Sequence, residues 1–523
     1  MKTFIQKQLY KLKPTSLAQK PFLMRALIIF LSGAACALAL PPYGLWPFFY
    51  LGFSVFFLTL STIKTKKSAF LFGWLFGLGY FLLGLNWIGN ALLVDGNEFA
   101  WVWPLAVIAL PASLGLFTGL ASLSAFIVNK KWNIPLFISL CLTLILTEYA
   151  RGHLFTGFPW NLFGYIWSDT LSIAQSAALL GPYGLTFLTL LWAIIPINFI
   201  TKKTDDKLTY KVAISTLIIA GLFGLFSLKK PIDYNETVQV QIVQPNISQA
   251  EKWDSALLPI NLNKHIHLSK RQKDAAPLKT VIVWPETALG PILVDSSAAR
   301  ELINGVLQEH PEGSMLLTGA LATDFLSNNI PKSYNAVTAI TKNTPPQHVY
   351  SKSHLVPFGE YIPLNNILPL ETITGFSGFM RGNGAKTISL TGIPSFSPMV
   401  CYEVIFPEAV VDRNNRPEWL LNVTNDAWYG KSAGPYQHFA QTRFRAIEQG
   451  LPLVRAANTG ISGIIDPKGR TIASQNLMEH GLIISKLPKP LPKTLYARYG
   501  EAPFLILMLL LVAILFYRRQ SQV

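Results

Sequence analysis

Charged residues and cysteines are scarce in this sequence. Only 14% of its 523 residues are charged, whereas about a quarter are charged in an average soluble protein. Such a composition excludes a disordered chain and a nucleic-acid-binding polypeptide. The three cysteines are Cys36, Cys141 and Cys401, which are too few for a disulfide framework and form no CxxC metal pair. Any cysteine with a chemical role must therefore act alone.

Common nucleotide and metal motifs are also missing. The sequence contains no Walker loop and no GxGxxG fingerprint. Its one close histidine pair, His265 and His267, is separated by two positions, and residues so spaced do not share a helix face. We therefore expect neither a cofactor nor a metal site.

Long apolar runs fill the first part of the chain and return at its end. A bilayer-spanning helix needs about 20 mostly apolar residues, and eight runs are candidates. These runs cover residues 22–40, 45–62, 68–94, 99–128, 132–147, 179–200, 212–228 and 502–517. The prediction is a multi-pass helical membrane domain in residues 1–228 and 499–523, which brackets an external domain in residues 229–498.

Basic residues indicate how the spans are oriented. The net charge is +16, yet Lys and Arg cluster at alternate ends of the apolar runs instead of forming one stripe. Because cytoplasmic loops are enriched in Lys and Arg, we expect both termini in the cytoplasm and residues 229–498 outside. A cleaved secretory signal at the N-terminus is the alternative. The turn Pro41-Pro42-Tyr43-Gly44 and the apolar run after it favour a retained helical hairpin.

The external region alternates between short β-rich runs and more polar segments. Such alternation is typical of an α/β layered fold, whose sites lie where strands run out into loops. Residues 435–450 have the pattern of a helix between two strands. The predicted strands are residues 238–243, 280–284, 315–318, 336–341, 397–401, 419–423 and 462–465.

Glu286 is the first candidate for chemistry in this region. It follows the apolar run Val281-Ile282-Val283-Trp284 and then Pro285. Because proline has no N–H for a strand ladder, the strand is expected to end there and to place the carboxylate at its tip. A carboxylate in such a place suits a general base. The alternative is a surface turn carboxylate.

Lys352 and Cys401 are the candidates in two later segments. Lys352 precedes His354 and Glu360, and its ammonium group would stabilise an oxyanion. A solvated surface lysine is the alternative, and His354 is a competing candidate. Cys401 is the only cysteine of the external region and ends an apolar run. An unpaired thiol in an oxidising compartment is an oxidation hazard unless it is used, which favours a nucleophile over a buried structural thiol.

Together these segments resemble the apolipoprotein N-acyltransferase family. Its members are bacterial inner-membrane enzymes whose external domain belongs to the nitrilase-like carbon–nitrogen hydrolase superfamily. The resemblance covers nearly the whole chain. Its marks are Pro-Pro-Tyr-Gly at 41–44, Thr-Glu-Tyr-Ala-Arg-Gly at 147–152, Gly-Phe-Pro-Trp at 157–160, Val-Gln-Pro-Asn-Ile at 243–247, Trp-Pro-Glu-Thr at 284–287, the segment 352–360, Val-Cys-Tyr-Glu at 400–403 and Thr-Asn-Asp-Ala-Trp-Tyr at 424–429.

The resemblance implies an αββα sandwich for the external domain and a role for each candidate. It implies that Cys401 is the acylated nucleophile, Glu286 the general base and Lys352 the stabiliser of the tetrahedral intermediate. Supporting or substrate-binding residues implied in the same way are Glu360, Trp253, Asn335, Tyr402 and Glu403.

The function implied is the last step of lipoprotein maturation in a Gram-negative inner membrane. A fatty acyl group would pass from a phospholipid, through a thioester on Cys401, to the N-terminal amine of a diacylglyceryl-modified apolipoprotein. A membrane-tethered amidase or hydrolase with the same triad is the alternative. A transporter with an external binding domain is disfavoured, because residues 68–94 and 99–128 carry no intramembrane charge.

Overall fold

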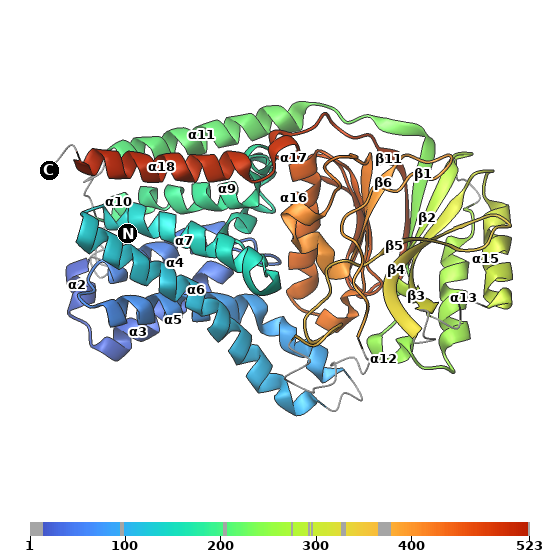
Figure 1. Cartoon of the computed structure of the whole chain (residues 1–523), viewed down its shortest axis with the longest axis horizontal. Helices are drawn as coiled ribbons and strands as arrows, with labels where there is room; N and C mark the ends of the chain where they lie inside the picture. The colour runs from blue at the N-terminus through green and yellow to red at the C-terminus, as the bar shows by residue number, and fades with distance from the viewer. Residues whose placement is uncertain are drawn as a thin grey trace, which may run out of the picture. The chain divides into compact units, whose positions relative to one another are not determined.

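The chain separates into two compact units. The computed structural model describes residues 14–94, 99–201, 207–272, 276–290, 293, 296–325, 331–363 and 378–520. The first unit comprises Met1–Gly89, Pro104–Lys230 and Arg498–Val523, and the second comprises Asn90–Trp103 and Pro231–Ala497. Figure 1 shows helices throughout the first unit and β-sheets in the second. The predicted basic residues before Pro14 and those at 202–203 lie outside the described residues.

The first unit is built from apolar helices. Four helical stretches are long and apolar enough to cross a membrane: Lys66–Leu93, Ala100–Trp132, Ala177–Thr201 and Lys207–Lys229. Shorter apolar helices cover Phe22–Ala37, Trp46–Leu60 and Ala502–Ile514. These helices are consistent with the predicted membrane domain, while the number of eight spans stays a prediction. The helices of this unit are α2 (Pro14–Ala18), α3 (Phe22–Ala37), α4 (Trp46–Leu60), α5 (Lys66–Leu85), α6 (Trp103–Trp132), α7 (Leu136–His153), α8 (Leu171–Ala174), α9 (Ala177–Trp192), α10 (Ile194–Thr201), α11 (Lys207–Lys229) and α18 (Ala502–Gln520).

Glycines allow helices α3 and α5 to pack closely. A Cβ atom at Gly33 would lie 1.9 Å from the carbonyl oxygen of Phe76, and one at Gly79 would lie 2.0 Å from that of Phe30. In a membrane, where apolar side chains gain little by leaving lipid, small residues promote helix association through close backbone contact. The glycines of these two apolar helices therefore serve packing.

The second unit contains two β-sheets that face each other across one hydrophobic core. The first sheet has six strands in the order β11-β1-β2-β3-β4-β5, and the second has five in the order β10-β9-β8-β7-β6. Strands β1, β2 and β3 are parallel, as are β6, β7 and β8. The strands are β1 (Tyr234–Gln244), β2 (Lys279–Leu289), β3 (Met315–Phe325), β4 (Pro331–Thr341), β5 (Gln347–Ser351), β6 (Phe396–Val400), β7 (Trp419–Val423), β8 (Leu453–Ala456), β9 (Ser462–Ile465), β10 (Thr471–Gln475) and β11 (Gly481–Pro488).

Helices cover the outer faces of the two sheets. Helices α13 (Leu258–Ser269) and α15 (Ser297–Glu309) share a hydrophobic core with β2 and β3, and α16 (Gly434–Gln449) contacts β8 and β9. In Figure 1, α13 and α15 lie on one side of the paired sheets and α16 on the other. This layering confirms the predicted αββα sandwich.

The predicted strands all occur, but some bounds and several elements differ. Strand β6 ends at Val400, and Cys401 begins the short 3-10 helix η5 (Cys401–Ile405), although the sequence predicted a strand through position 401. The helix predicted at 435–450 is α16. Elements of the second unit that the sequence did not predict include the strands β5, β8, β10 and β11 and the helices α13 and α15.

Candidate active site

The three residues predicted to act as a triad come from separate strands. Glu286 lies in β2, where regular pairing with β3 is interrupted after Trp284. Lys352 directly follows β5, and Cys401 directly follows β6. Strand β2 continues past Pro285, so the prediction that it ends there is wrong. The proline, which has no N–H, instead coincides with the break in pairing.

A buried ammonium group lies between two carboxylates. Lys352 Nζ is 2.8 Å from Glu360 Oε1 and 3.7 Å from Glu286 Oε1. Burial alone would lower the pKa of Lys352, but the carboxylates of Glu360 and Glu286 together outweigh burial and hold that pKa above its usual value. Lys352 is therefore cationic at neutral pH, as stabilisation of an oxyanion requires.

Asn335 connects the same two carboxylates. Its Nδ2 donates a hydrogen bond to Glu286 Oε1 at 2.7 Å and another to Glu360 Oε1 at 3.0 Å. Because ionised carboxylate oxygens only accept hydrogen bonds, these contacts fix the orientation of the amide. Asn335 thus holds Glu286 and Glu360 on either side of the Lys352 ammonium group.

Glu286 is also held through its second oxygen and its backbone. Oε2 accepts a hydrogen bond from the backbone N–H of Asn425 at 2.8 Å, and the Glu286 carbonyl oxygen accepts one from Lys252 Nζ at 2.8 Å. The Asn425 side chain in turn donates a hydrogen bond to Gln249 at 2.7 Å and accepts one from Asn458 at 2.8 Å. The carboxylate of Glu286 therefore has little freedom to turn.

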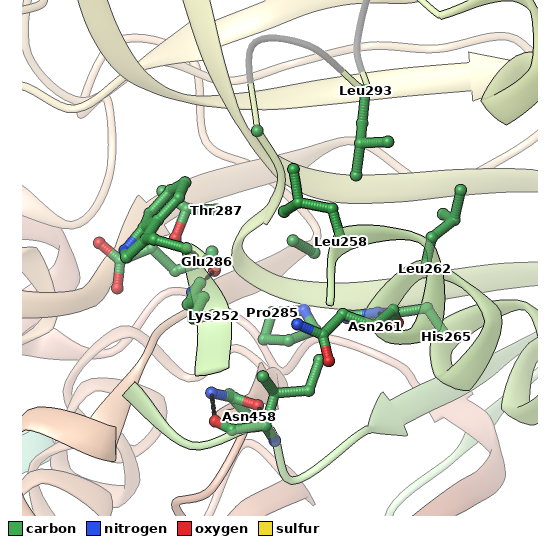
Figure 2. Close-up of a pocket in the computed structure, with 14 residues that line it drawn as sticks. Lys252, Leu258, Asn261, Leu262, His265, Pro285, Glu286, Thr287, Leu293 and Asn458 are labelled. Atoms are coloured by element: carbon green, nitrogen blue, oxygen red, sulfur yellow. Dashed lines mark hydrogen bonds between the residues drawn. The ribbon is translucent and has the colours of Figure 1, made fainter. Parts of the chain in front are cut away.

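A small cavity adjoins Glu286. It offers about 20 Å³ of space to water, which is room for about one molecule. Figure 2 shows Glu286 and Lys252 next to each other among the residues that line the cavity, which also include Leu258 of α13. Trp253 lines the same cavity, is 39% exposed, and has its ring 5.8 Å from Lys252 Nζ. The predicted residue Trp253 therefore lines the cavity beside Glu286 and is partly exposed.

Cys401 is a buried residue with a strained backbone. It is 7% exposed and has a φ of +51°, a left-handed conformation that non-glycine residues adopt at an energetic cost. Burial, followed by the charge of Glu286, raises the pKa of the thiol to about 12, against the opposing effects of Lys352 and Thr424. The thiol is therefore protonated at neutral pH, and its chemistry requires a base close by.

Glu403 joins the nucleophile's turn to the segment after β5. Its Oε2 accepts the N–H of Val400 at 2.7 Å. Its Oε1 accepts the hydroxyl of Tyr350 at 2.6 Å and the backbone N–H groups of Ser353 and His354 at 2.7 and 3.1 Å. These bonds tie the residue before Cys401 to the residues after Lys352, which supports a positioning role for Glu403.

Tyr402 and His354 belong to an aromatic cluster beside Cys401. The ring of His354 stacks on Phe406 with 3.6 Å between centroids, and the ring of Tyr402 meets Phe406 edge-on at 5.1 Å. Burial raises the pKa of Tyr402 above its usual value, so its phenol stays protonated. His354, the competing candidate, is therefore packed against aromatic rings.

The histidine pair of the sequence does not form a joint site. His265 is buried in α13, with Nδ1 2.8 Å from the Asn261 carbonyl oxygen, whereas His267 on the same helix is exposed. Across the residues that the structure describes, no group of three His, Cys, Asp or Glu side chains could hold a metal ion.

Comparison with known proteins adds an independent observation. The family described as Apolipoprotein N-acyltransferase N-terminal domain matches residues 32–195, and the Carbon-nitrogen hydrolase family matches residues 239–491. The apolipoprotein N-acyltransferase of Rhodopseudomonas palustris is 39% identical over 519 residues, which covers 95% of this chain and 95% of that protein. That of Rickettsia typhi is 35% identical over 489 residues, which covers 92% and 95%. This chain belongs to the apolipoprotein N-acyltransferase family.

Membership of the apolipoprotein N-acyltransferase family confirms the predicted resemblance and the enzyme class, which is an acyltransferase. It favours acyl transfer over the amidase alternative. The roles of Glu286, Lys352 and Cys401 stay predictions, because sequence matches over a whole chain do not test single residues.

Several residues around the site were not predicted. Lys252 and Asn425 contact Glu286 directly, and Thr424 lies close enough to the Cys401 thiol to lower its pKa. One signal was present for the last two, because Thr424 and Asn425 follow the buried strand β7 as Cys401 follows β6. Polar residues at the ends of neighbouring parallel strands are expected to meet.

Proposed function

We propose that this protein moves a fatty acyl chain from a membrane phospholipid to the N-terminal amine of diacylglyceryl-modified apolipoproteins, through a thioester on Cys401. One observation carries the proposal. In a chain of the apolipoprotein N-acyltransferase family, a buried lysine is paired with two carboxylates, one of which also acts electrostatically on a buried thiol.

In the first half-reaction the phospholipid ester acylates the thiol. Glu286 removes the Cys401 proton as sulfur attacks the ester carbonyl carbon, and the C–S bond forms. The Lys352 ammonium group, 3.7 Å from Glu286 Oε1, stabilises the negative oxygen of the tetrahedral intermediate. A donor of this kind contributes about 10²–10³ in rate. The ester C–O bond then breaks, and the proton on Glu286 passes to the leaving lysophospholipid oxygen.

In the second half-reaction the lipoprotein amine receives the acyl chain. An α-amino group has a pKa of about 7.7, so about a sixth of it is uncharged at pH 7. Its nitrogen attacks the thioester carbon, the C–N bond forms, and the C–S bond breaks. The amine proton passes by way of Glu286 to the thiolate and restores the thiol. Formation of an amide from a thioester is downhill, so no nucleotide is consumed, and the kinetics are ping-pong.

Burial of the site supports transfer over hydrolysis. Cys401 is 7% exposed and Glu286 is 6% exposed, so bulk water has little access to a thioester held there. Exclusion of water protects reactive intermediates from hydrolysis. Asn335 and Glu360 act as positioning residues, since their hydrogen bonds fix the side chains of Glu286 and Lys352 relative to each other.

The proposal includes a location. Lys and Arg clusters at alternate ends of the apolar runs support a multi-pass inner-membrane protein with cytoplasmic termini and a periplasmic catalytic unit. Both substrates carry acyl chains, so they reach such a site from the bilayer.

The direct test is to trap the acyl-enzyme. Purified protein incubated with phospholipid labelled in its acyl chain, and quenched without acceptor, is expected to carry label that hydroxylamine releases. Cys401→Ala should abolish the adduct. Cys36→Ala and Cys141→Ala should leave it intact, because those thiols contact the backbone carbonyls of Phe49 and Leu190 inside the helical unit.

Addition of acceptor completes the test. A diacylglyceryl lipopeptide with a free N-terminus should clear the adduct and become N-acylated, whereas the same lipopeptide with a blocked amine should not. Release of free fatty acid instead of N-acylated peptide would show a hydrolase. An adduct formed by the Cys401→Ala protein would exclude the thioester.

A further inference from the structure

A buried polar cluster that the proposed reaction does not use lies behind Cys401. It consists of His438 on α16, Asp426 at the start of the 3-10 helix η7 (Asp426–Tyr429), and Arg455 on β8. All three side chains are 0% exposed. His438 Nε2 lies 3.2 Å from the carbonyl oxygen of Cys401, so the cluster touches the backbone of the candidate nucleophile.

The contacts of His438 determine where its proton lies. A carbonyl oxygen only accepts hydrogen bonds, so Nε2 must carry a hydrogen and donate it to Cys401. Nδ1 faces two groups, because it lies 3.0 Å from Asp426 Oδ1 and 3.0 Å from Arg455 Nη2. A charged imidazolium would donate to Asp426, whereas a neutral ring would accept from Arg455.

The surroundings favour the neutral ring. Burial and the neighbouring Arg455 guanidinium lower the pKa of His438, and the carboxylate of Asp426 opposes them without reversing the direction. The neutral ring then has one arrangement that satisfies both nitrogens. Nε2–H donates to the Cys401 carbonyl, and Nδ1 accepts from Arg455.

Arg455 and Asp426 are themselves fixed. Arg455 Nη2 donates to Asp426 Oδ2 at 2.6 Å, Nε donates to the Ile461 carbonyl at 3.2 Å, and Nη1 donates to Asn422 Oδ1. Burial would raise the pKa of Asp426, but the charge of Arg455 is the largest opposing influence and that pKa lies below its usual value, so the carboxylate stays ionised. One positive and one negative charge thus cancel around the neutral ring of His438.

Cys401 needs such an anchor because of its backbone. At φ +51° the residue is in a conformation that costs about 1–2 kcal/mol and persists only where the surroundings impose it. On its N-terminal side, Val400 N–H is held by Glu403 Oε2 at 2.7 Å. On its C-terminal side, the carbonyl of Cys401 is held by His438. The backbone is thus held at Val400, one residue before Cys401, and at the peptide group directly after it, which restricts the direction of the Cα–Cβ bond that carries the sulfur.

We propose that His438 is a positioning residue for acyl transfer, which holds Cys401 in its left-handed conformation by donating Nε2–H to the Cys401 carbonyl, with Arg455 and Asp426 fixing the ring that donates. The inference rests on the proposed function in one respect, namely that Cys401 is the acylated residue. It assigns to a histidine outside the triad a direct part in presenting the thiol to Glu286.

Two amide substitutions separate hydrogen bonding from packing. In His438→Gln the amide nitrogen stands as many bonds from the backbone as Nε2 does, so it can still donate to Cys401. In His438→Asn the amide nitrogen is one bond short and cannot reach. The matched control is His310→Asn, because His310 is also buried and its Nε2 lies 2.9 Å from a backbone carbonyl, that of Ser269, away from the site.

The first measurement is single-turnover acylation of the full-length protein by labelled phospholipid. Misplacement of a reacting group by about 1 Å can cost about 10²-fold in rate, so His438→Asn should acylate about 10²-fold more slowly, with an unchanged dependence on phospholipid concentration. His438→Gln should recover at least about tenfold of that loss, and His310→Asn should match the unsubstituted protein within about twofold. Equal rates for the Asn and Gln variants, or a His438→Asn rate within twofold of the unsubstituted protein, would overturn the proposal.

The second measurement needs no acyl donor. Alkylation of Cys401 by iodoacetamide, followed by mass spectrometry of its peptide, should be slower in His438→Asn because the thiol no longer faces Glu286. Faster alkylation would mean a loosened fold and would overturn the positioning role. If the unsubstituted protein forms no adduct with phospholipid, the proposed function fails, while the alkylation rates still decide the role of His438.

Discussion

At the scale of single residues, the site keeps its sulfur protonated until a substrate is present. The pKa of Cys401 is raised to about 12, against about 8.5 for an ordinary thiol. Very little thiolate exists at neutral pH, so under the proposed mechanism the thiolate forms only as Glu286 accepts the proton. A resting thiol of this kind reacts slowly with stray oxidants and electrophiles, which suits the periplasmic location that we propose.

Lys252 gives a prediction that depends on pH. Burial lowers its pKa to about 8, although Glu286 and Cys401 oppose the shift, whereas an unfolded lysine titrates near 10.4. Below about pH 8 both states are protonated, and the folded state bears the full cost of the buried charge. Between pH 8 and 10.4 the unfolded chain holds more protons, so stability rises with pH. This difference in the pKa of Lys252 between the folded and unfolded states corresponds to about 3 kcal/mol of folding stability.

The substitution Lys252→Met should remove this dependence. We expect the variant to be more stable than the unsubstituted protein at pH 7, or equally stable, and the difference to move by about 3 kcal/mol in favour of the unsubstituted protein by pH 10.5. Thermal unfolding of both proteins in detergent across this pH range measures it. Lys264→Met, which removes an exposed lysine, is the control. A difference that stays constant with pH would contradict the buried ammonium.

Single residues could be predicted from the sequence when they follow a buried strand. Glu286 and Cys401 were predicted because each comes at the end of an apolar run, and Lys352 was predicted from its chemistry and from the family resemblance; the roles of all three stay predictions. The residues that hold them were not predicted from such runs, because their contacts join distant segments. Asn425 meets Glu286 across 139 positions and His438 meets Cys401 across 37, and no local pattern reports such pairings.

At the scale of elements, Glu403 links the turn of the nucleophile to the segment after β5. Its two oxygens accept hydrogen bonds from Val400, Tyr350, Ser353 and His354. In Glu403→Gln one carboxylate oxygen is replaced by an NH₂ group, which cannot accept hydrogen bonds from the donors that face it. We expect the variant to lose about 3 kcal/mol of stability and at least about tenfold in the rate of acylation, since the turn at Cys401 loses an anchor.

The matched control for this prediction is Glu418→Gln. Glu418 also accepts a backbone N–H, that of Ser395 at 3.1 Å, but the bond is exposed. Thermal unfolding and single-turnover acylation should therefore change little in this variant. Equal losses in the two variants would show that Glu403 has no special link to the site.

The strands that the sequence predicted are those that contain a continuous run of buried apolar residues. Strands β6, β7 and β9 are buried at every position, so their apolar runs are continuous. Strands β5 and β10 are partly exposed along their length, and their sequences therefore mix polar with apolar residues. Strand β8 is buried but has only four residues, including Arg455, and so it gave no recognisable run. The missed elements are those in which tertiary contacts, instead of local composition, stabilise the strand.

At the scale of the whole molecule, the distribution of positive charge predicts the membrane topology. Basic clusters flank alternate ends of the apolar runs, so Lys66 should face the cytoplasm and Lys386 the periplasm. Both side chains are exposed. In Lys386→Cys a membrane-impermeant maleimide should label intact spheroplasts, and in Lys66→Cys it should label only lysed ones.

The labelling experiment uses a background with Cys36→Ala and Cys141→Ala, so that only Cys401 remains besides the new thiol. Cys401 is buried and should label slowly in both variants. Labelling of Lys66→Cys in intact spheroplasts would reverse the predicted topology, and it would place the acyl-transfer site on the wrong side for exported lipoproteins.

The left-handed backbone at position 401 bears on which residue types would suit this position. Glycine adopts a φ of +51° without the steric cost that cysteine bears, a difference of about 1 kcal/mol. In Cys401→Gly this backbone cost would disappear, but the buried sulfur and, under the proposed mechanism, all acyl transfer would be lost with it. The fold alone therefore gives no reason for a cysteine in this conformation, and the proposed chemistry supplies one.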